Sequence, residues 1–101
     1  MLTVPPEIIL KTSTSSNLQV KITETAVIKC HVTGVPTPAV QWHFNGQLID
    51  RSNQRYDITR DGRTLRINDV QVNDAGRYTC VAKNAAGIAE RDFNLEALGK
   101  I

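Results

Sequence analysis

The sequence lacks the features that mark membrane-spanning, nucleic-acid-binding or glycosylated segments. Among its 101 residues, no run approaches the roughly 18 apolar residues that a membrane-spanning helix needs. The formal net charge is only +2, which is too small to favour nucleic acid as a partner. The motif Asn-x-Ser/Thr does not occur, so we expect no N-linked glycan. We therefore expect faces that are open to protein contacts, with no membrane insertion by this segment.

Patterns for catalysis and for cofactor or metal binding are missing as well. There is no glycine-rich phosphate loop and no 12-residue calcium loop. The two histidines, His31 and His43, lie on the outward phase of their strands, so we expect both to be solvated. The serines lie in polar loops without a nucleophile motif: Ser13, Ser15, Ser16 and Ser52. The sequence predicts no catalytic residue, no metal site and no cofactor, and hence no enzyme.

What the sequence does contain is an alternation of apolar and polar residues along most of its length. Such alternation gives a β-strand one buried and one exposed face. The dipeptides Asn45-Gly46 and Asp61-Gly62 are typical of tight turns between antiparallel strands. Strands are predicted over residues 7–10, 18–22, 25–33, 39–44, 47–50, 55–59, 63–68, 76–83 and 87–97. Their spacing predicts an all-β antiparallel sandwich or barrel, with one helical turn at residues 72–75.

The predicted domain covers residues 7–98. Residues 1–6 contain Pro5 and Pro6, which exclude a helix, and we interpret this segment as an extended lead or as the end of a preceding module. Residues 99–101 are assigned to a C-terminal tail. A cluster of serine and threonine over residues 12–16 has strand-like apolar residues on both sides. We expect this cluster to cross between two short edge strands.

The two cysteines, Cys30 and Cys80, are 50 positions apart, and each lies on the apolar phase of its strand. They could be a reduced pair of small buried residues, or one disulfide that joins two sheets. A metal site is disfavoured, because the adjacent His31 points to the opposite face of its strand. Closing a loop of about 50 residues would stabilise the domain by roughly 4 kcal/mol. The sequence favours the disulfide, which implies an oxidising compartment.

The residues around the cysteines closely resemble the signature of the immunoglobulin fold. Trp42 follows Cys30 by twelve residues, and the run Asp74-Ala75-Gly76-Arg77-Tyr78-Thr79-Cys80 closes the pattern. The resemblance covers nearly the whole chain. It implies a two-sheet antiparallel Greek-key β-sandwich in which Cys30 and Cys80 form a disulfide.

The same resemblance implies roles for the residues of the core signature. Trp42 would pack its indole over the disulfide. Tyr78 fits the tyrosine corner, in which the hydroxyl bonds to the backbone upstream. Gly76 would allow a tight turn into the penultimate strand. Leu65, on the apolar phase of its strand, belongs to the same core.

A salt bridge is also implied by the resemblance. Asp74 would be its acidic partner, and Arg55 is the preferred basic partner, ahead of Arg60. The fold further implies that His31 and His43 lie in opposite sheets, which excludes a metal shared between them.

Only a short strand pair fits between Phe44 and Arg55, where a variable domain would need two more strands. The chain is therefore similar to the intermediate set (I-set) of immunoglobulin domains. Within that set, the run Arg91-Asp92-Phe93-Asn94-Leu95 most resembles the tandem modules of the hemicentin family of the extracellular matrix. Titin-like muscle proteins and peroxidasin-like matrix proteins carry modules of similar pattern.

The resemblance implies a structural and adhesive module of a multi-domain extracellular matrix or cell-adhesion protein, acting as a disulfide-locked spacer and protein-binding surface. Expected partners are neighbouring immunoglobulin modules and matrix or cell-surface proteins, including copies of itself. An intracellular, sarcomeric scaffold module and an accessory module of a matrix enzyme are the alternatives. Four arginines interleaved with aspartates are weak candidates for an acidic partner: Arg51, Arg60, Arg63 and Arg66.

Overall fold

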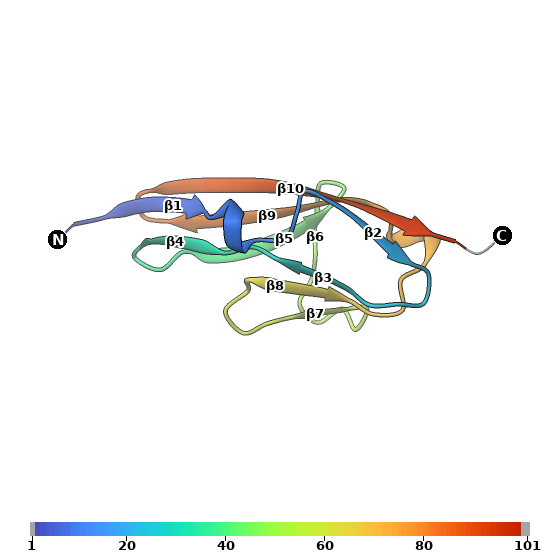
Figure 1. The fold of residues 1–101 in the computed structure, drawn as a ribbon. Helices are drawn as coiled ribbons and strands as arrows, with labels where there is room; N and C mark the ends of the chain where they lie inside the picture. Colours follow the sequence, from blue (N-terminus) through green and yellow to red (C-terminus); the bar gives the residue numbers. More distant parts are fainter. Residues whose placement is uncertain (1, 100–101) are drawn as a thin grey trace.

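The structure, a computed structural model, describes residues 2–99 and places them in two packed layers of β-strands (Figure 1). The strands are β1 (Val4–Ile8), β2 (Asn17–Lys21), β3 (Ala26–Lys29), β4 (Val32–Val35), β5 (Ala39–Phe44), β6 (Gln47–Leu48), β7 (Tyr56–Ile58), β8 (Thr64–Ile67), β9 (Gly76–Asn84) and β10 (Gly87–Leu98). Two 3-10 turns, η1 (Leu10–Thr12) and η2 (Val72–Asp74), connect strands. The predicted sandwich and the predicted turn near residue 72 are confirmed, whereas η1 was not predicted.

One layer is a single sheet, and the other is made of two smaller sheets. The five-stranded sheet has the order β2-β10-β9-β5-β6, and β2 and β10 run parallel within it. The facing layer contains the three-stranded antiparallel sheet β3-β8-β7. The antiparallel pair β1-β4 continues from β3 toward the end of the molecule where the chain begins (Figure 1).

The strand predicted over residues 25–33 is divided into β3 and β4. β3 pairs with β8, whereas β4 pairs with β1. At the division, the Cys30 amide donates to the carbonyl of Arg63 at 2.8 Å, and the His31 amide donates to the hydroxyl of Ser13 at 2.9 Å. The prediction of one continuous strand is wrong, because the backbone changes its partner here and alternation does not record which partner a strand has.

The first strand begins earlier than the predicted start of the domain at residue 7. β1 starts at Val4, and the register with β4 shifts between Val4 and Glu7. Pro5 and Pro6 lie within this irregularity, where missing amide donors disturb the ladder least. After η1, the serine and threonine cluster carries the chain to the five-stranded sheet, where β2 begins at Asn17. The predicted crossing is confirmed.

The hydrophobic core lies between the layers and draws on both of them. Its largest fully buried side chains are Trp42, Tyr78, Phe93, Ile28, Leu65 and Ile67. Trp42 and Phe93 pack with their ring centroids 5.9 Å apart, and Phe44 stacks on Tyr78 at 4.6 Å. These aromatic contacts add to the apolar area that the core buries.

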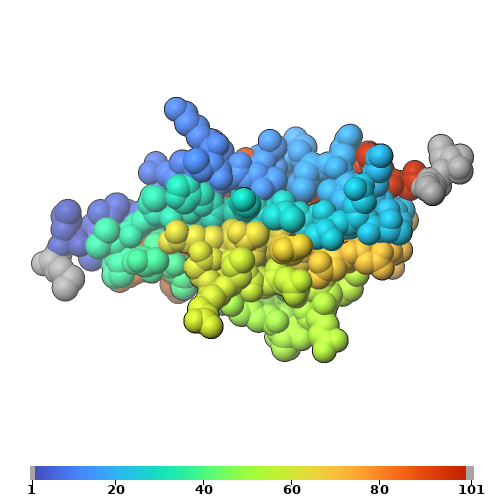
Figure 2. All heavy atoms as spheres, turned by 60° about the horizontal axis from the view of Figure 1, so that its bottom comes forward, coloured from blue at the N-terminus to red at the C-terminus, as the bar shows by residue number. Residues whose placement is uncertain are grey.

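The molecule is elongated, with extents of 57 × 28 × 20 Å along its principal axes. β1 begins at one end of the long axis and β10 ends at the other (Figure 1). Figure 2 shows the side of the three-stranded sheet, where the segment before β7 (yellow-green) and the turn between β7 and β8 (yellow) protrude separately.

Candidate functional site

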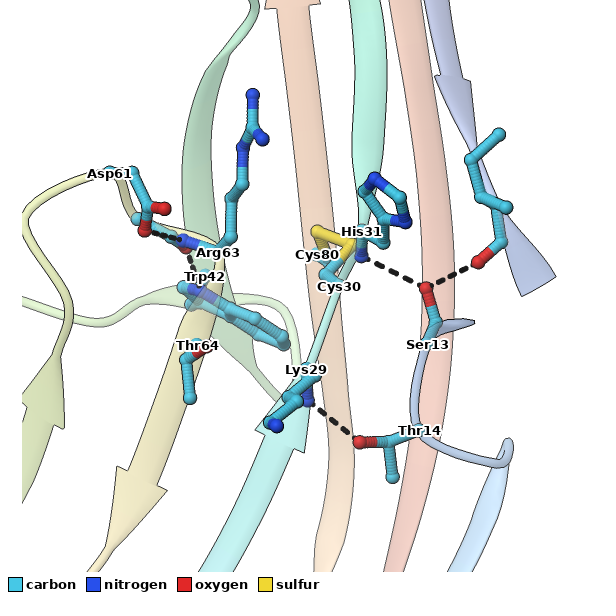
Figure 3. The surroundings of a disulfide bond; sticks show 12 residues. Ser13, Thr14, Lys29, Cys30, His31, Trp42, Asp61, Arg63, Thr64 and Cys80 are labelled. Carbon is cyan, nitrogen blue, oxygen red and sulfur yellow. Dashed lines mark hydrogen bonds between the residues drawn. A yellow bond between two sulfur atoms is a disulfide. The ribbon is translucent and has the colours of Figure 1, made fainter. Parts of the chain in front are cut away.

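A disulfide joins the two layers at the centre of the molecule. Cys30 lies at the division between β3 and β4, and Cys80 lies in β9 of the five-stranded sheet (Figure 3). Their sulfur atoms are bonded, their Cα atoms are 6.5 Å apart, and both residues are fully buried. The predicted disulfide is confirmed, and the alternative of a reduced pair does not describe this structure.

Trp42 packs in the core beside this bridge. It is the register partner of Cys80 on β5 and is 1% exposed. Its indole Nε1 donates a hydrogen bond of 2.7 Å to the carbonyl oxygen of Gly62 (Figure 3). Gly62 has φ +79°, and a Cβ there would lie 3.1 Å from the carbonyl oxygen of Val40. The turn whose carbonyl accepts the hydrogen bond from the indole thus requires glycine at position 62.

The tyrosine corner is formed as predicted. The hydroxyl of Tyr78 donates to the carbonyl oxygen of Asp74 at 2.6 Å. Burial, followed by the neighbouring Tyr56 and Asp74, raises the pKa of Tyr78. Gly76, between these residues, has φ +148°, and a Cβ there would lie 2.7 Å from Oδ1 of Asn45. Gly76 therefore allows the start of β9 to lie close to the turn between β5 and β6.

The predicted salt bridge between Asp74 and Arg55 is confirmed. The Asp74 carboxylate also accepts the backbone amide of Gln71 at 2.7 Å, and its side chain is only 9% exposed. Arg55 donates in addition to the carbonyl oxygens of Asn68 at 2.7 Å and Asp69 at 3.3 Å. One buried carboxylate and one arginine thus hold together the loop that leads into β9.

The two histidines lie in different layers, as predicted, but neither is freely solvated. His31 is partly buried, and its Nδ1 contacts the hydroxyl of Thr12 in η1. His43, on β5, is also partly buried, and its Nδ1 is enclosed without a hydrogen-bond partner among residues 2–99. The expectation of solvated side chains is wrong, because η1 covers one ring and neighbouring strands flank the other.

The four candidate arginines do not line a common cavity. Arg51 lines a hollow with Trp42 and Ile58, whereas Arg60 lines a separate one with Thr59. Arg66 is exposed on β8 opposite Asp57 of β7, and Arg63 is partly buried with its Nε enclosed. Asp61 accepts the Thr59 hydroxyl at 2.6 Å and the Arg63 amide at 3.0 Å, and these bonds lower its pKa. Binding of an acidic partner by these arginines stays a prediction.

Asn84 is a structural residue that the sequence did not single out. Its amide nitrogen donates to the carbonyl oxygens of Val4 at 2.8 Å and Pro36 at 3.0 Å. Its amide oxygen accepts the backbone amides of Ala86 and Gly87. Asparagine before Ala-Ala-Gly indicates a turn, but the link to the start of β1 depends on residues 80 positions away.

Residues 2–99 offer neither a metal site nor a membrane-spanning helix. In the part of the chain that the structure describes, no group of three or more His, Cys, Asp or Glu could hold a metal ion. None of the helical segments described has the length and hydrophobicity of a membrane-spanning helix.

A two-layer β-sandwich with an interlayer disulfide, a tryptophan beside it and a tyrosine corner defines an immunoglobulin-like domain. The model of the immunoglobulin I-set domain matches residues 10–97, and the chain belongs to this family.

Two curated proteins and one solved structure illustrate what the chain is similar to. Mouse hemicentin-1 is 38% identical over 92 residues, covering 91% of the chain and 2% of that protein. Mouse roundabout homolog 1 is 42% identical over 80 residues, covering 79% of the chain and 5% of that protein. The structure of titin domain M7 superimposes with a TM-score of 0.85 at 26% identity, covering 96% of the chain and 97% of that domain. The chain thus spans a few per cent of the length of these two curated relatives.

Proposed function

We propose that the chain is a non-catalytic structural and adhesive immunoglobulin module of a multi-domain extracellular matrix or cell-adhesion protein. The observation that carries this proposal is the buried disulfide between Cys30 and Cys80. Disulfides persist in oxidising compartments and are rare in the cytosol. The similarity to hemicentin-1 and to roundabout homolog 1 supports the same assignment.

Within such a protein, the module would act as a stiff spacer between neighbouring modules. The chain enters and leaves at opposite ends of a body that is 57 Å long (Figure 1). The entry is held, because Val4 pairs with Val35 and its carbonyl oxygen accepts a hydrogen bond from Asn84. Because β1 is held at its start, a preceding module joined by a short linker would keep a defined direction relative to this one.

The partners proposed for the module are neighbouring immunoglobulin modules and matrix or cell-surface proteins. A second candidate function, an intracellular scaffold module of the titin type, is favoured by the superposition on titin M7.

The oxidation state of the cysteines in native material separates the two candidates. Native protein is denatured in the presence of N-ethylmaleimide without reductant, and the peptides that contain Cys30 and Cys80 are analysed by mass spectrometry. We expect both peptides to be unmodified before reduction and alkylated after it. Cysteines of a cytosolic protein in the same sample control for air oxidation. Alkylation of both cysteines without reduction would overturn the extracellular assignment.

A further inference from the structure

The outer face of the five-stranded sheet carries charges in columns that run along the strands. Core residues alternate with outward ones on β9 and β10, which lie side by side along the long axis (Figure 1). The charged outward residues of β9 are both basic: Arg77 and Lys83. Those of β10 are all acidic: Glu90, Asp92 and Glu96. A basic column therefore lies next to an acidic column.

These charges are not neutralised by one another. Among residues 2–99, the salt bridge at Asp74 involves neither column. Asp92 accepts the hydroxyl of Thr79 at 2.7 Å, and Glu96 accepts the amide of Gln19 at 3.1 Å. The carboxylates of the acidic column thus have further lone pairs that can accept hydrogen bonds.

We propose that this face binds a second copy of the chain, with the two copies side by side and parallel. A face that binds its own copy does so about a two-fold axis. In the aligned mode of face-to-face packing, two sheets keep their strands within about 30° of each other, and the two-fold axis then runs either along the strands or across them. An axis along the strands places the basic column of each copy over the acidic column of the other. An axis across the strands places each column on itself, where like charges repel.

The register shows which residues meet in the parallel arrangement. Arg77 is the partner of Asn94 in the ladder, so in the pair its guanidinium would lie between Asp92 and Glu96 of the second copy. Lys83 is the partner of Ile88 in the ladder, so in the pair its ammonium group would lie near Glu90 of the second copy. Complementary charges of this kind fix orientation and register more than they add affinity.

The size of the face predicts a weak contact. Four strands about 4.8 Å apart over a length of about 30 Å give roughly 600 Å² per copy. The pair would bury roughly 1,200 Å² in total, the lower limit for a specific interface. Exposed apolar side chains at its margin, Ile88 and Leu48, are 60% and 58% exposed. The inference rests on the proposed function, because many such contacts along two parallel arrays would add up through multivalency.

The test measures the self-association of the parent and of three variants by sedimentation equilibrium, at protein concentrations up to about 1 mM. The first is Arg77→Glu/Lys83→Glu, which makes both columns acidic. The second is Glu90→Lys/Asp92→Lys, which makes both columns mainly basic. We expect the parent to self-associate, each variant alone to bind at least tenfold more weakly, and an equimolar mixture of the two to regain association.

The matched control is Lys29→Glu/Arg66→Glu, which changes the net charge by the same amount on the outer face of β3 and β8. We expect its self-association to equal that of the parent, and equal loss would overturn the assignment to the five-stranded face. Circular dichroism establishes that each variant is folded. A parent that stays monomeric at 1 mM overturns the inference and leaves the cysteine experiment, and with it the proposed function, unaffected.

Energy transfer between dyes at the chain ends tests the orientation. Because the molecule is 57 Å long, two N-terminal labels lie near each other in a parallel pair and far apart in an antiparallel one. We expect efficient transfer between two N-terminal labels and weak transfer between an N-terminal and a C-terminal label. The reverse result would overturn the parallel arrangement.

Discussion

Tyr78 connects the core to the loop that leads into β9. Its ring is fully buried and stacks on Phe44, while its hydroxyl reaches the carbonyl oxygen of Asp74 at 2.6 Å. The carboxylate of that aspartate binds Arg55 from the other side of the loop. A single side chain therefore contributes both apolar burial and a specific polar contact, and the two contributions can be separated by substitution.

Tyr78→Phe should cost about 1–2 kcal/mol of unfolding free energy at pH 7, because the hydroxyl is lost and the Asp74 carbonyl loses its donor. The pKa of Tyr78 is raised in the folded state, so its contribution is fully present below the ordinary tyrosine pKa near 10. That contribution is lost as pH rises above 10. The parent should therefore lose stability more steeply than the variant between pH 10 and pH 11, as measured by urea unfolding.

The pKa of Tyr56 is also raised by burial, so the variant keeps part of the alkaline dependence. An unchanged gap between parent and variant from pH 7 to pH 11 would contradict the link between Tyr78 ionisation and unfolding.

At the scale of elements, the crossing between the two layers is held by short polar side chains. The Ser13 hydroxyl donates to the carbonyl oxygen of Ile9 at 2.7 Å and accepts the amide of His31 at 2.9 Å. Thr14 adds two bonds to the backbone of Lys29, one through its hydroxyl at 2.7 Å and one through its amide at 2.9 Å (Figure 3). The crossing thus supplies hydrogen-bond partners for the backbone at the division between β3 and β4.

Ser13→Ala should lower the unfolding free energy by about 1–2 kcal/mol, because a partly buried amide and carbonyl lose their shared partner. Hydrogen exchange at the amide of His31 should become faster than in the parent. Ser15→Ala is the matched control, since this serine is exposed in the same cluster and should leave both measurements unchanged. Equal exchange rates at His31 in parent and variant would contradict the role of the crossing.

Alternation in the sequence predicted the strands, which neighbouring residues determine, and the family resemblance supplied two distant pairs, Cys30 with Cys80 and Arg55 with Asp74. Other contacts between distant residues were missed. Cys30, Trp42 and Tyr78 carry a spaced pattern, and alternation placed their strands within a few residues. The division of the strand at His31 depends on Ser13, which lies in another segment, and alternation contains no record of it. The link from Asn84 to Val4 spans 80 positions and was missed for the same reason. The charge columns on β9 and β10 needed the register between strands before they could be recognised.

At the scale of the whole molecule, the disulfide between Cys30 and Cys80 joins the two layers within the core. Both cysteines are fully buried, and Trp42, the register partner of Cys80, is buried as well. The loop that the bridge closes contains β4 to β8 and most of β9. Without it, the unfolded chain gains freedom over half of its length.

The double variant Cys30→Ala/Cys80→Ala should be less stable than the parent by about 4 kcal/mol, the loss expected for a loop of about 50 residues. This loss is comparable with the lower part of the range of about 5–15 kcal/mol for small domains. Guanidinium unfolding followed by tryptophan fluorescence gives the difference, and the reduced parent serves as a second measurement. A difference below about 1 kcal/mol would show that packing alone holds the layers together.

The parallel pairing of β2 with β10 affects how the module would respond to tension. The chain enters at one end of the molecule, before β1 and β2, and leaves at the opposite end, after β10 (Figure 1). When the ends are pulled apart, these two strands are drawn lengthwise past each other. The hydrogen bonds between Asn17–Lys21 and β10 then bear the force together and do not break one after another. Such a joint resists shear up to a threshold and then gives way abruptly, so the module would keep its length under moderate stretching.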